Sequence, residues 1–237
     1  MATRTQTLTL VDAVIPGAKL AGLSRIAREA ILVLGFAGLI AAFAQIAILP
    51  PGTTVPITGQ TFGVLLSGAA LGSKRGGLTT LIYILLGSLW LPVFAPPTSF
   101  LQKETVHFIL PWAGTQRPVW DLSSGGYIVG FVLAAYVVGK LAERGWDRRA
   151  RVTLAMVLGN LLIYSVGVPW MAYFIASGAT IPGLGKTYYD FIAGSNVLDK
   201  TLRGSLYPYI AGDALKLLLA AMALPGAWAL VGRRKRS

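Results

Sequence analysis

The sequence predicts an all-α integral membrane protein, a bundle of six transmembrane helices. Three observations support this class. Of the 237 residues, 54% are hydrophobic and only 13% are charged, compared with about 25% charged residues in soluble domains. Apolar runs near the length that crosses a bilayer, about 17–25 residues, recur along the chain. The basic residues gather in the segments between these runs, in the pattern that sets the orientation of membrane proteins.

The apolar runs define the predicted spans, which are residues 31–49, 58–73, 76–95, 125–143, 152–176 and 205–232. We interpret all six as helices, because lipid leaves the backbone N–H and C=O groups without partners in anything but a helix or a closed barrel. The 58–73 run begins with polar residues, which indicates that its start is buried in protein or lines a cavity. The 50–57 connection is short, whereas the 96–124 and 177–204 connections are long enough to be lids or binding loops, or else irregular surface excursions.

The distribution of basic residues predicts that both termini are cytoplasmic. Fifteen of the 21 Lys and Arg residues lie in the N-terminal segment, the 73–75 turn, the 140–151 segment and the C-terminal tail, and five lie in the opposite connections. An even number of spans with cytoplasmic ends requires this alternation. Residues 1–30 are then a cytoplasmic or interfacial segment, and residues 233–237 are a basic cytoplasmic tail. We therefore expect a multi-pass protein of the plasma or inner membrane.

Two charged residues lie deep inside the last predicted span. Asp213 is the only one of the nine acidic residues that is deep in a span, and Lys216 follows three positions later. This spacing places both side chains on one face of a helix. A lone charge at the bilayer centre costs about 2.5–3.5 kcal/mol, so such residues are candidates for a functional site that faces the bundle interior. A salt bridge between helices is the structural alternative.

Other polar residues lie at compatible depths on the remaining spans. The candidate pocket residues are Thr58, Gln60, Thr61, Gly125, Gly126, Tyr127, Asn160, Asp213 and Lys216. The glycine pair opens the fourth span, where the absence of a side chain lets a ligand approach the N–H groups of a helix N-terminus. Asn160 can instead bond a neighbouring helix, and Tyr127 can belong to the interfacial aromatic belt. Their convergence on the outer half predicts a small-molecule pocket.

Catalysis and cofactor binding are poorly supported by the sequence. There is no cysteine, and the only histidine, His107, lies in a connection far from any span. No nucleophile elbow, zinc-protease motif or P-loop is present, so we expect no enzyme activity, no metal and no cofactor. The net charge of +12 is explained by membrane orientation rather than by nucleic acid. Transport then requires either a separate motor or an ion gradient, and an ion- or proton-coupled carrier remains the alternative.

Small residues mark a candidate partner surface on the first predicted span. Ala37 and Ala41 share one face, and Gly38 and Ala42 share another. Small residues four positions apart let helices approach closely. The same spacing occurs at Gly68-x-x-x-Gly72 and Gly126-x-x-x-Gly130, where packing inside the bundle explains it equally well.

Five sequence blocks follow one another along the chain: Val55–Gly76, Leu91–Ala95, Gly125–Phe131, Gly159-Asn160 and Gly212–Lys216. Together these blocks resemble the BioY family of biotin-specific substrate-capture (S) components of energy-coupling factor (ECF) transporters. The resemblance implies a six-helix S component with an outward biotin pocket that the 50–57 connection closes. It also implies that Asp213 and Lys216 contact biotin. The implied partners are an EcfT-type transmembrane subunit, which docks on the small-residue face of the first helix, and two cytoplasmic ATP-binding subunits. The chain departs from the family pattern at Ser123-Ser124, where Pro-Thr is usual, and in its longer 96–124 connection.

Overall fold

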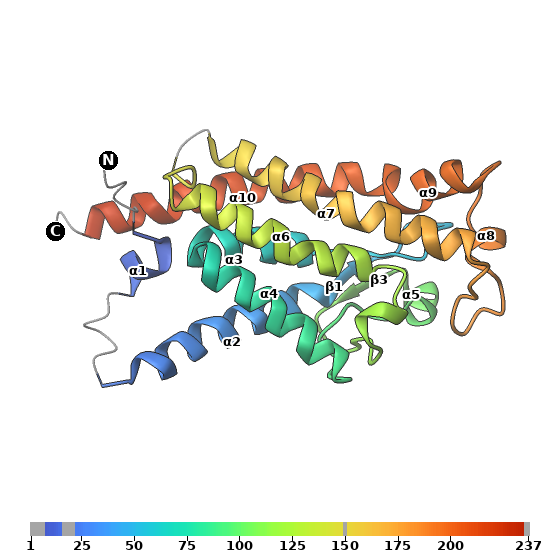
Figure 1. The fold of residues 1–237 in the computed structure, drawn as a ribbon, viewed down its shortest axis with the longest axis horizontal. Helices are drawn as coiled ribbons and strands as arrows, with labels where there is room; N and C mark the ends of the chain where they lie inside the picture. The colour runs from blue at the N-terminus through green and yellow to red at the C-terminus, as the bar shows by residue number, and fades with distance from the viewer. Residues whose placement is uncertain (1–7, 16–21, 149–150, 235–237) are drawn as a thin grey trace.

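The structure is a computed structural model that describes residues 8–15, 22–148 and 151–234. Long helices form an elongated bundle (Figure 1). They are α2 (Arg25–Ala44), α3 (Gln60–Leu71), α4 (Ser73–Ser88), α6 (Gly125–Ala142), α7 (Arg151–Ala176) and α10 (Tyr207–Arg234). Each contains most of one predicted span, because each apolar run is continuous enough to form a helix.

Helix α6 packs against α3, α4 and α7, and glycines let these helices approach closely. A Cβ atom on Gly68 of α3 would lie 2.5 Å from the backbone oxygen of Ala135. A Cβ atom on Gly130 would lie 3.0 Å from the Cα atom of Ile163 on α7. The small residues of α3 and α6 that are spaced four apart therefore serve helix packing within the bundle, rather than the docking of a partner.

The prediction of an all-α fold is wrong at one place, where a small antiparallel sheet follows α2. Its strands are β1 (Ile46–Ile48), β2 (Ile57–Thr58) and β3 (Val106–Phe108), in the order β2-β1-β3. The predicted first span includes residues 46–48, but α2 ends at Ala44, with Gln45 as its C-cap residue. The Gln45 amide is fully buried, donates to the Phe94 carbonyl and accepts from the Ala113 N–H. These long-range bonds and the β-branched residues that follow favour a strand over another helical turn.

Four segments of the described chain are helical, long and apolar enough to cross a membrane. They are Arg25–Ala44, Gly125–Ala142, Arg151–Ala176 and Val197–Val231, the last of which joins α9 (Val197–Ser205) to α10. Helices α3 and α4 have 12 and 16 residues, hence lengths of about 18 and 24 Å, less than the roughly 30 Å of a hydrocarbon core. The predicted span 76–95 is too long because α4 ends at Ser88 and Trp90 adopts a positive φ of 62°.

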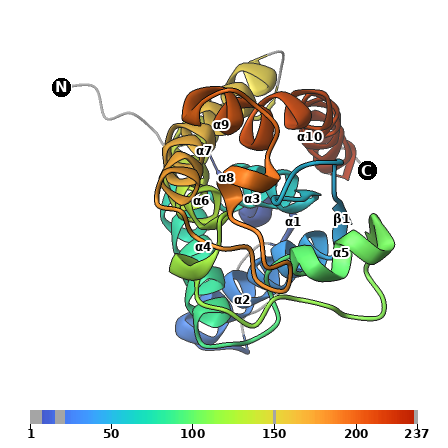
Figure 2. The same cartoon turned by 90° about the vertical axis from the view of Figure 1, so that its right-hand side faces the viewer.

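The end of the bundle that carries the sheet is capped by short helices from the two long connections. These are α5 (Thr98–Glu104), the 3-10 helix η2 (Val119–Asp121), α8 (Tyr188–Phe191) and α9. Viewed from this end, α8 lies over the middle of the bundle (Figure 2). Tyr188 and Ile192 pack with Val55 and Met171 in a separate apolar cluster. The connections are therefore ordered caps and not irregular excursions.

At the other end, α1 (Leu10–Val14) lies beside the C-terminal part of α10 (Figure 1). Asp12 of α1 pairs with Arg28 at 3.1 Å and with Arg75 at 3.0 Å, and Arg75 also pairs with Glu29 at 2.6 Å. This network connects the first part of the chain to α2 and α4. Residues 1–7 and 16–21 of the predicted 1–30 segment, and 235–237 of the predicted basic tail, lie outside the described residues.

Candidate functional site

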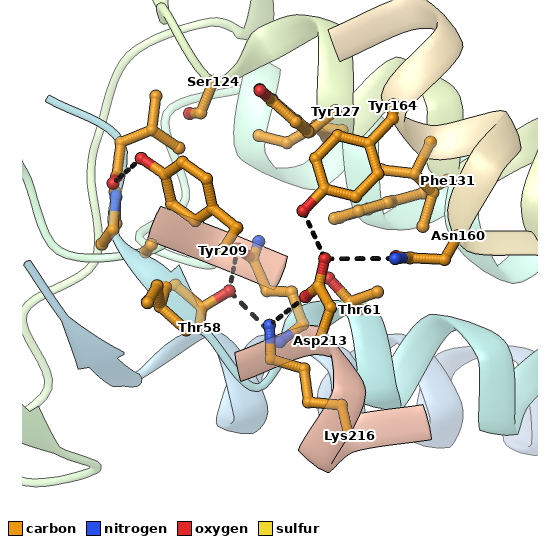
Figure 3. A pocket seen from close by; sticks show the side chains of 17 residues that line it. Thr58, Thr61, Ser124, Tyr127, Phe131, Asn160, Tyr164, Tyr209, Asp213 and Lys216 are labelled. Carbon is orange, nitrogen blue, oxygen red and sulfur yellow. Dashed lines mark hydrogen bonds and ion pairs between the residues drawn. The ribbon is translucent and has the colours of Figure 1, made fainter. Parts of the chain in front are cut away.

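A cavity opens inside the half of the bundle that the caps cover. Its walls come from the 55–58 segment, from the start of α3, and from α6, α7 and α10. All the predicted pocket residues except the two glycines line it (Figure 3): Thr58, Gln60, Thr61, Tyr127, Asn160, Asp213 and Lys216. The fold thus gathers side chains that are separated by more than 150 positions in the sequence.

Asp213 is the centre of the polar cluster in this cavity. Its Oδ1 atom accepts a hydrogen bond from Lys216 Nζ at 2.9 Å. Its Oδ2 atom accepts from the Asn160 amide at 3.1 Å and from the Tyr164 hydroxyl. The Asp213 side chain is 9% exposed and that of Lys216 is 13% exposed, so the pair is largely withdrawn from solvent. The pair joins neighbouring turns of α10 and reaches α7 through the two other donors.

The cluster keeps hydrogen-bonding capacity that its own members do not use. The Oδ1 atom of Asn160 is buried and has no hydrogen-bond partner among the described residues. The ammonium of Lys216 can donate three hydrogen bonds, and one of them goes to Asp213. A buried acceptor without a partner is unfavourable by about 1–3 kcal/mol. The cavity is therefore suited to a neutral ligand group that contains both N–H donors and a carbonyl.

Polar residues at the start of α3 are committed to the protein framework. Thr58 donates to the Gln60 side-chain oxygen at 2.8 Å, and the Gln60 amide donates to the Tyr83 hydroxyl at 2.6 Å. Tyr83 in turn donates to the Val93 carbonyl at 3.0 Å. Gln60 consequently lines the cavity with an amide whose orientation is fixed by neighbours on both sides. This chain of bonds also holds β2 and the start of α3 against α4.

Two tyrosines form the aromatic wall and connect it to the caps. The Tyr209 hydroxyl donates to the Val55 carbonyl at 2.6 Å, and the Tyr127 hydroxyl donates to the Ser205 carbonyl at 2.6 Å. The Tyr127 ring also makes an edge-to-face contact with the Tyr164 ring, with centroids 5.9 Å apart. Because these hydroxyls anchor the 50–57 connection and the end of α9, the cavity wall and its cover are one connected unit.

Gly125 and Gly126 do not line the cavity. A Cβ atom on Gly125 would lie 2.1 Å from the Val119 oxygen, and one on Gly126 would lie 2.3 Å from the Cβ atom of Trp170. The N–H group of Gly125 already donates to the Leu122 carbonyl at 2.9 Å. The structure therefore uses these glycines to let the start of α6 pack on α7 and η2, which is a different role from the predicted ligand approach.

Sequence reasoning missed two tyrosines of the site. Tyr164 lies four residues after Asn160 on α7, and Tyr209 lies four residues before Asp213 on α10. Residues four apart share a helical face. Searching each helix at this spacing from its most polar residue finds both tyrosines without any structure.

The two candidate faces of the first long helix differ in burial. Ala37 and Ala41 are 1% and 3% exposed and pack inside the chain. Gly38 is exposed, a Cβ atom there would have no neighbour within 4 Å, and Ala42 is half-buried. Of the two registers, the one with Gly38 and Ala42 is accessible to a partner.

Comparisons with known proteins agree with this architecture. A sequence profile of the BioY family matches residues 10–116 and 119–233. A biotin transporter BioY from Rhodobacter capsulatus is 35% identical over 200 residues, which cover 82% of this chain and 90% of that protein. A biotin transporter BioY from Thermotoga maritima is 32% identical over 187 residues, covering 79% and 88% of the two chains.

One crystal structure has the same fold, with a TM-score of 0.60 over 91% of this chain and 95% of the other, at 16% sequence identity. It is described as the S-component for biotin from an ECF-type ABC transporter. The family match covers nearly the whole chain and includes every element that lines the cavity. This chain is therefore a multi-pass membrane protein that belongs to the BioY family.

Proposed function

We propose that this protein captures biotin in the cavity around Asp213 and takes part in its uptake as the S component of an ECF transporter. The observation that carries the proposal is the unpartnered Asn160 acceptor beside the Asp213–Lys216 pair, in a chain of the BioY family. ATP hydrolysis is then supplied by partner subunits, and this chain carries out no catalytic step of its own.

The ureido ring of biotin matches the unused bonding capacity of the cluster. It presents one carbonyl acceptor and two N–H donors. The remaining N–H groups of Lys216 are suited to the carbonyl. The free Asn160 oxygen and the remaining lone pairs of Asp213 are suited to the two N–H groups, while Thr58, Gln60, Thr61 and Tyr127 shape the walls. Hydrogen bonds to charged groups are shorter and stronger than neutral ones, which supports selective capture.

For the membrane arrangement, we propose six spans built on α2, α3, α4, α6, α7 and α10, with both termini cytoplasmic. The excess of basic residues at the end that contains α1 and the last turns of α10 supports this orientation. The short helices α3 and α4 cross only with the help of neighbouring protein, since they are shorter than the hydrocarbon core. The cavity and its caps then face outward, where the substrate is met.

For the coupling partner, we propose that the face of α2 with Gly38 and Ala42 docks against an EcfT-type transmembrane subunit. This face is accessible, whereas Ala37 and Ala41 are already packed inside the chain. A small-residue face lets another helix approach closely in lipid. Gly38→Leu is then expected to abolish co-purification with the coupling subunit without loss of biotin binding, and retained co-purification contradicts this register.

Binding of biotin to the purified full-length chain tests the proposed site. We expect Asp213→Asn and Lys216→Met each to abolish measurable binding in calorimetry. Lys140→Met is the matched control, because Lys140 also pairs with an acid three residues away, Glu143, but at the other end of α6. Normal biotin binding by both site variants would refute the assignment.

Uptake into vesicles distinguishes the proposed function from an ion- or proton-coupled carrier. If the chain is an S component, vesicles take up biotin continuously only when the coupling subunit and the ATPases are present and ATP is supplied. Uptake by this chain alone, driven by an ion gradient, contradicts it. Mass spectrometry of the small molecules that co-purify with the chain identifies the ligand independently.

A further inference from the structure

A second cavity lies directly beside the one that contains Asp213. The two share a wall made of Pro56, Gln60, Ala95, Ser124 and Ile128. Residues from all three connections at the capped end line the second cavity. They include Thr54 from the 50–57 connection, Arg117 from the 96–124 connection and Tyr188 from the 177–204 connection. It therefore lies between the Asp213 cluster and the caps.

Arg117 carries the only positive charge among the described residues that line the second cavity. Its Nη2 atom is 4.0 Å from the Asp121 carboxylate, and both side chains are more than 40% exposed. Such a long, exposed ion pair is weak, so the guanidinium remains available to another carboxylate. Burial raises the pKa of Tyr188, while a hydrogen bond with Ser123 and the charge of Arg117 oppose the rise. Arg117 and Tyr188 both line the second cavity.

Arg117 lies at the break between the two segments of the chain that match the family, residues 10–116 and 119–233. Nothing in the family match therefore assigns it a role.

The two cavities together have a polar end, an apolar middle and a cationic end. Asp213, Lys216 and Asn160 line only the first cavity, and Arg117 lines only the second. Three of the five shared wall residues, Pro56, Ala95 and Ile128, are apolar. A ligand with a neutral hydrogen-bonding head, an aliphatic chain and a terminal carboxylate has the same order of chemistry. Biotin has this composition, with its ureido ring, alkyl chain and carboxylate.

We propose that Arg117 binds the terminal carboxylate of the ligand and thereby selects the free acid over its neutral derivatives. This inference rests on the proposed biotin function and extends it to the mouth of the site. The planar guanidinium suits a carboxylate because its N–H groups can donate two parallel hydrogen bonds. Asp121 competes for the same guanidinium, so it weakens the binding of the acid.

Calorimetry with biotin and with biotin methyl ester on the full chain in lipid nanodiscs tests the assignment. The wild-type protein is expected to bind the acid more tightly than the ester. Arg117→Ala is expected to weaken binding of the acid by about tenfold, the effect of losing one hydrogen bond to a charged group, and to leave binding of the ester unchanged. Asp121→Asn is expected to tighten binding of the acid.

Arg203→Ala is the matched control, since Arg203 forms a similar i,i+4 pair with Asp199 on α9 but lines neither cavity. Its affinities for both ligands should equal those of the wild type. The assignment of Arg117 is overturned if Arg117→Ala leaves the affinity for the acid unchanged or weakens both ligands equally. Failure of the wild type to bind biotin at all refutes the proposed function instead, which keeps the two failures distinguishable.

Discussion

Neutralising the Asp213–Lys216 pair is expected to destabilise the ligand-free protein more when the acid is removed than when the base is removed. Among the described residues, Asp213 is the only hydrogen-bond or ion-pair partner of Lys216. Asp213 also accepts hydrogen bonds from Asn160 and Tyr164. Asp213→Asn therefore leaves a buried ammonium without a counter-charge, whereas Lys216→Met leaves a carboxylate that two donors still stabilise.

The size of the difference follows from the burial of the pair. Removing one partner of a buried ion pair costs about 3–5 kcal/mol. We expect Asp213→Asn to cost about 3 kcal/mol, because 13% of the Lys216 side chain remains exposed. For Lys216→Met we expect about 1.5 kcal/mol, roughly one hydrogen bond to a charged group. At about 2–4 °C per kcal/mol for a chain of this length, the two Tm values fall by roughly 6–12 °C and 3–6 °C.

Thermal unfolding of the purified protein without ligand, followed by tryptophan fluorescence, measures these shifts. The double variant Asp213→Asn/Lys216→Met should lose less than the sum of the single losses, by on the order of 1–3 kcal/mol, because it removes both charges together. Additive losses, or a larger loss from Lys216→Met than from Asp213→Asn, would show that the two charges do not stabilise one another in the way the structure describes.

Three other perturbations test helix packing, the site and the pH dependence of stability. Gly68→Ala places a methyl group 2.5 Å from a carbonyl oxygen of α6 and should lower the free energy of unfolding by about 1–3 kcal/mol. The control is Gly35→Ala, whose methyl group lies in open space on α2 and should cause no loss of Tm. Tyr164→Phe removes one donor to the central carboxylate and should lower the free energy of unfolding by about 1.5–3 kcal/mol, and an unchanged Tm contradicts that bond. Burial raises the pKa of Asp147, which lies in the connection between α6 and α7. The native state therefore binds a proton at this carboxyl group more tightly than the unfolded state does. As a result, the free energy of unfolding falls as the pH rises from the ordinary carboxyl pKa through the raised one. Asp147→Asn should therefore gain stability relative to the wild type over that pH interval, as measured by Tm at a series of pH values, and a pH-independent difference contradicts the shift.

The site shows where local spacing is sufficient for prediction and where it is not. Asp213 and Lys216 are identified by sequence because charge inside an apolar run is rare and costly. Their i,i+3 spacing then places them on one face of α10, where the structure shows them paired at 2.9 Å. Tyr164 could have been predicted in the same way, from its spacing of four residues from Asn160. Gly125 and Gly126 were predicted to line the cavity, but Val119 and Trp170 cover them. A glycine pair at a helix start has the same sequence whether its backbone is open to a ligand or covered by another side chain, so spacing could not distinguish the two cases.

The sequence by itself determined the membrane class, the main helices and the buried charged pair, because hydropathy, helix period and charge cost act over a few turns of chain. Only the tertiary structure decided that residues 46–48 form a strand, since the bonds of Gln45 that end α2 reach 49 and 68 positions along the chain. It likewise decided that Ala37 faces inward while Gly38 faces outward, and that Arg117 lines a cavity next to the one that contains Asp213. Burial and proximity of this kind depend on which helices pack together, and no single helix contains that information.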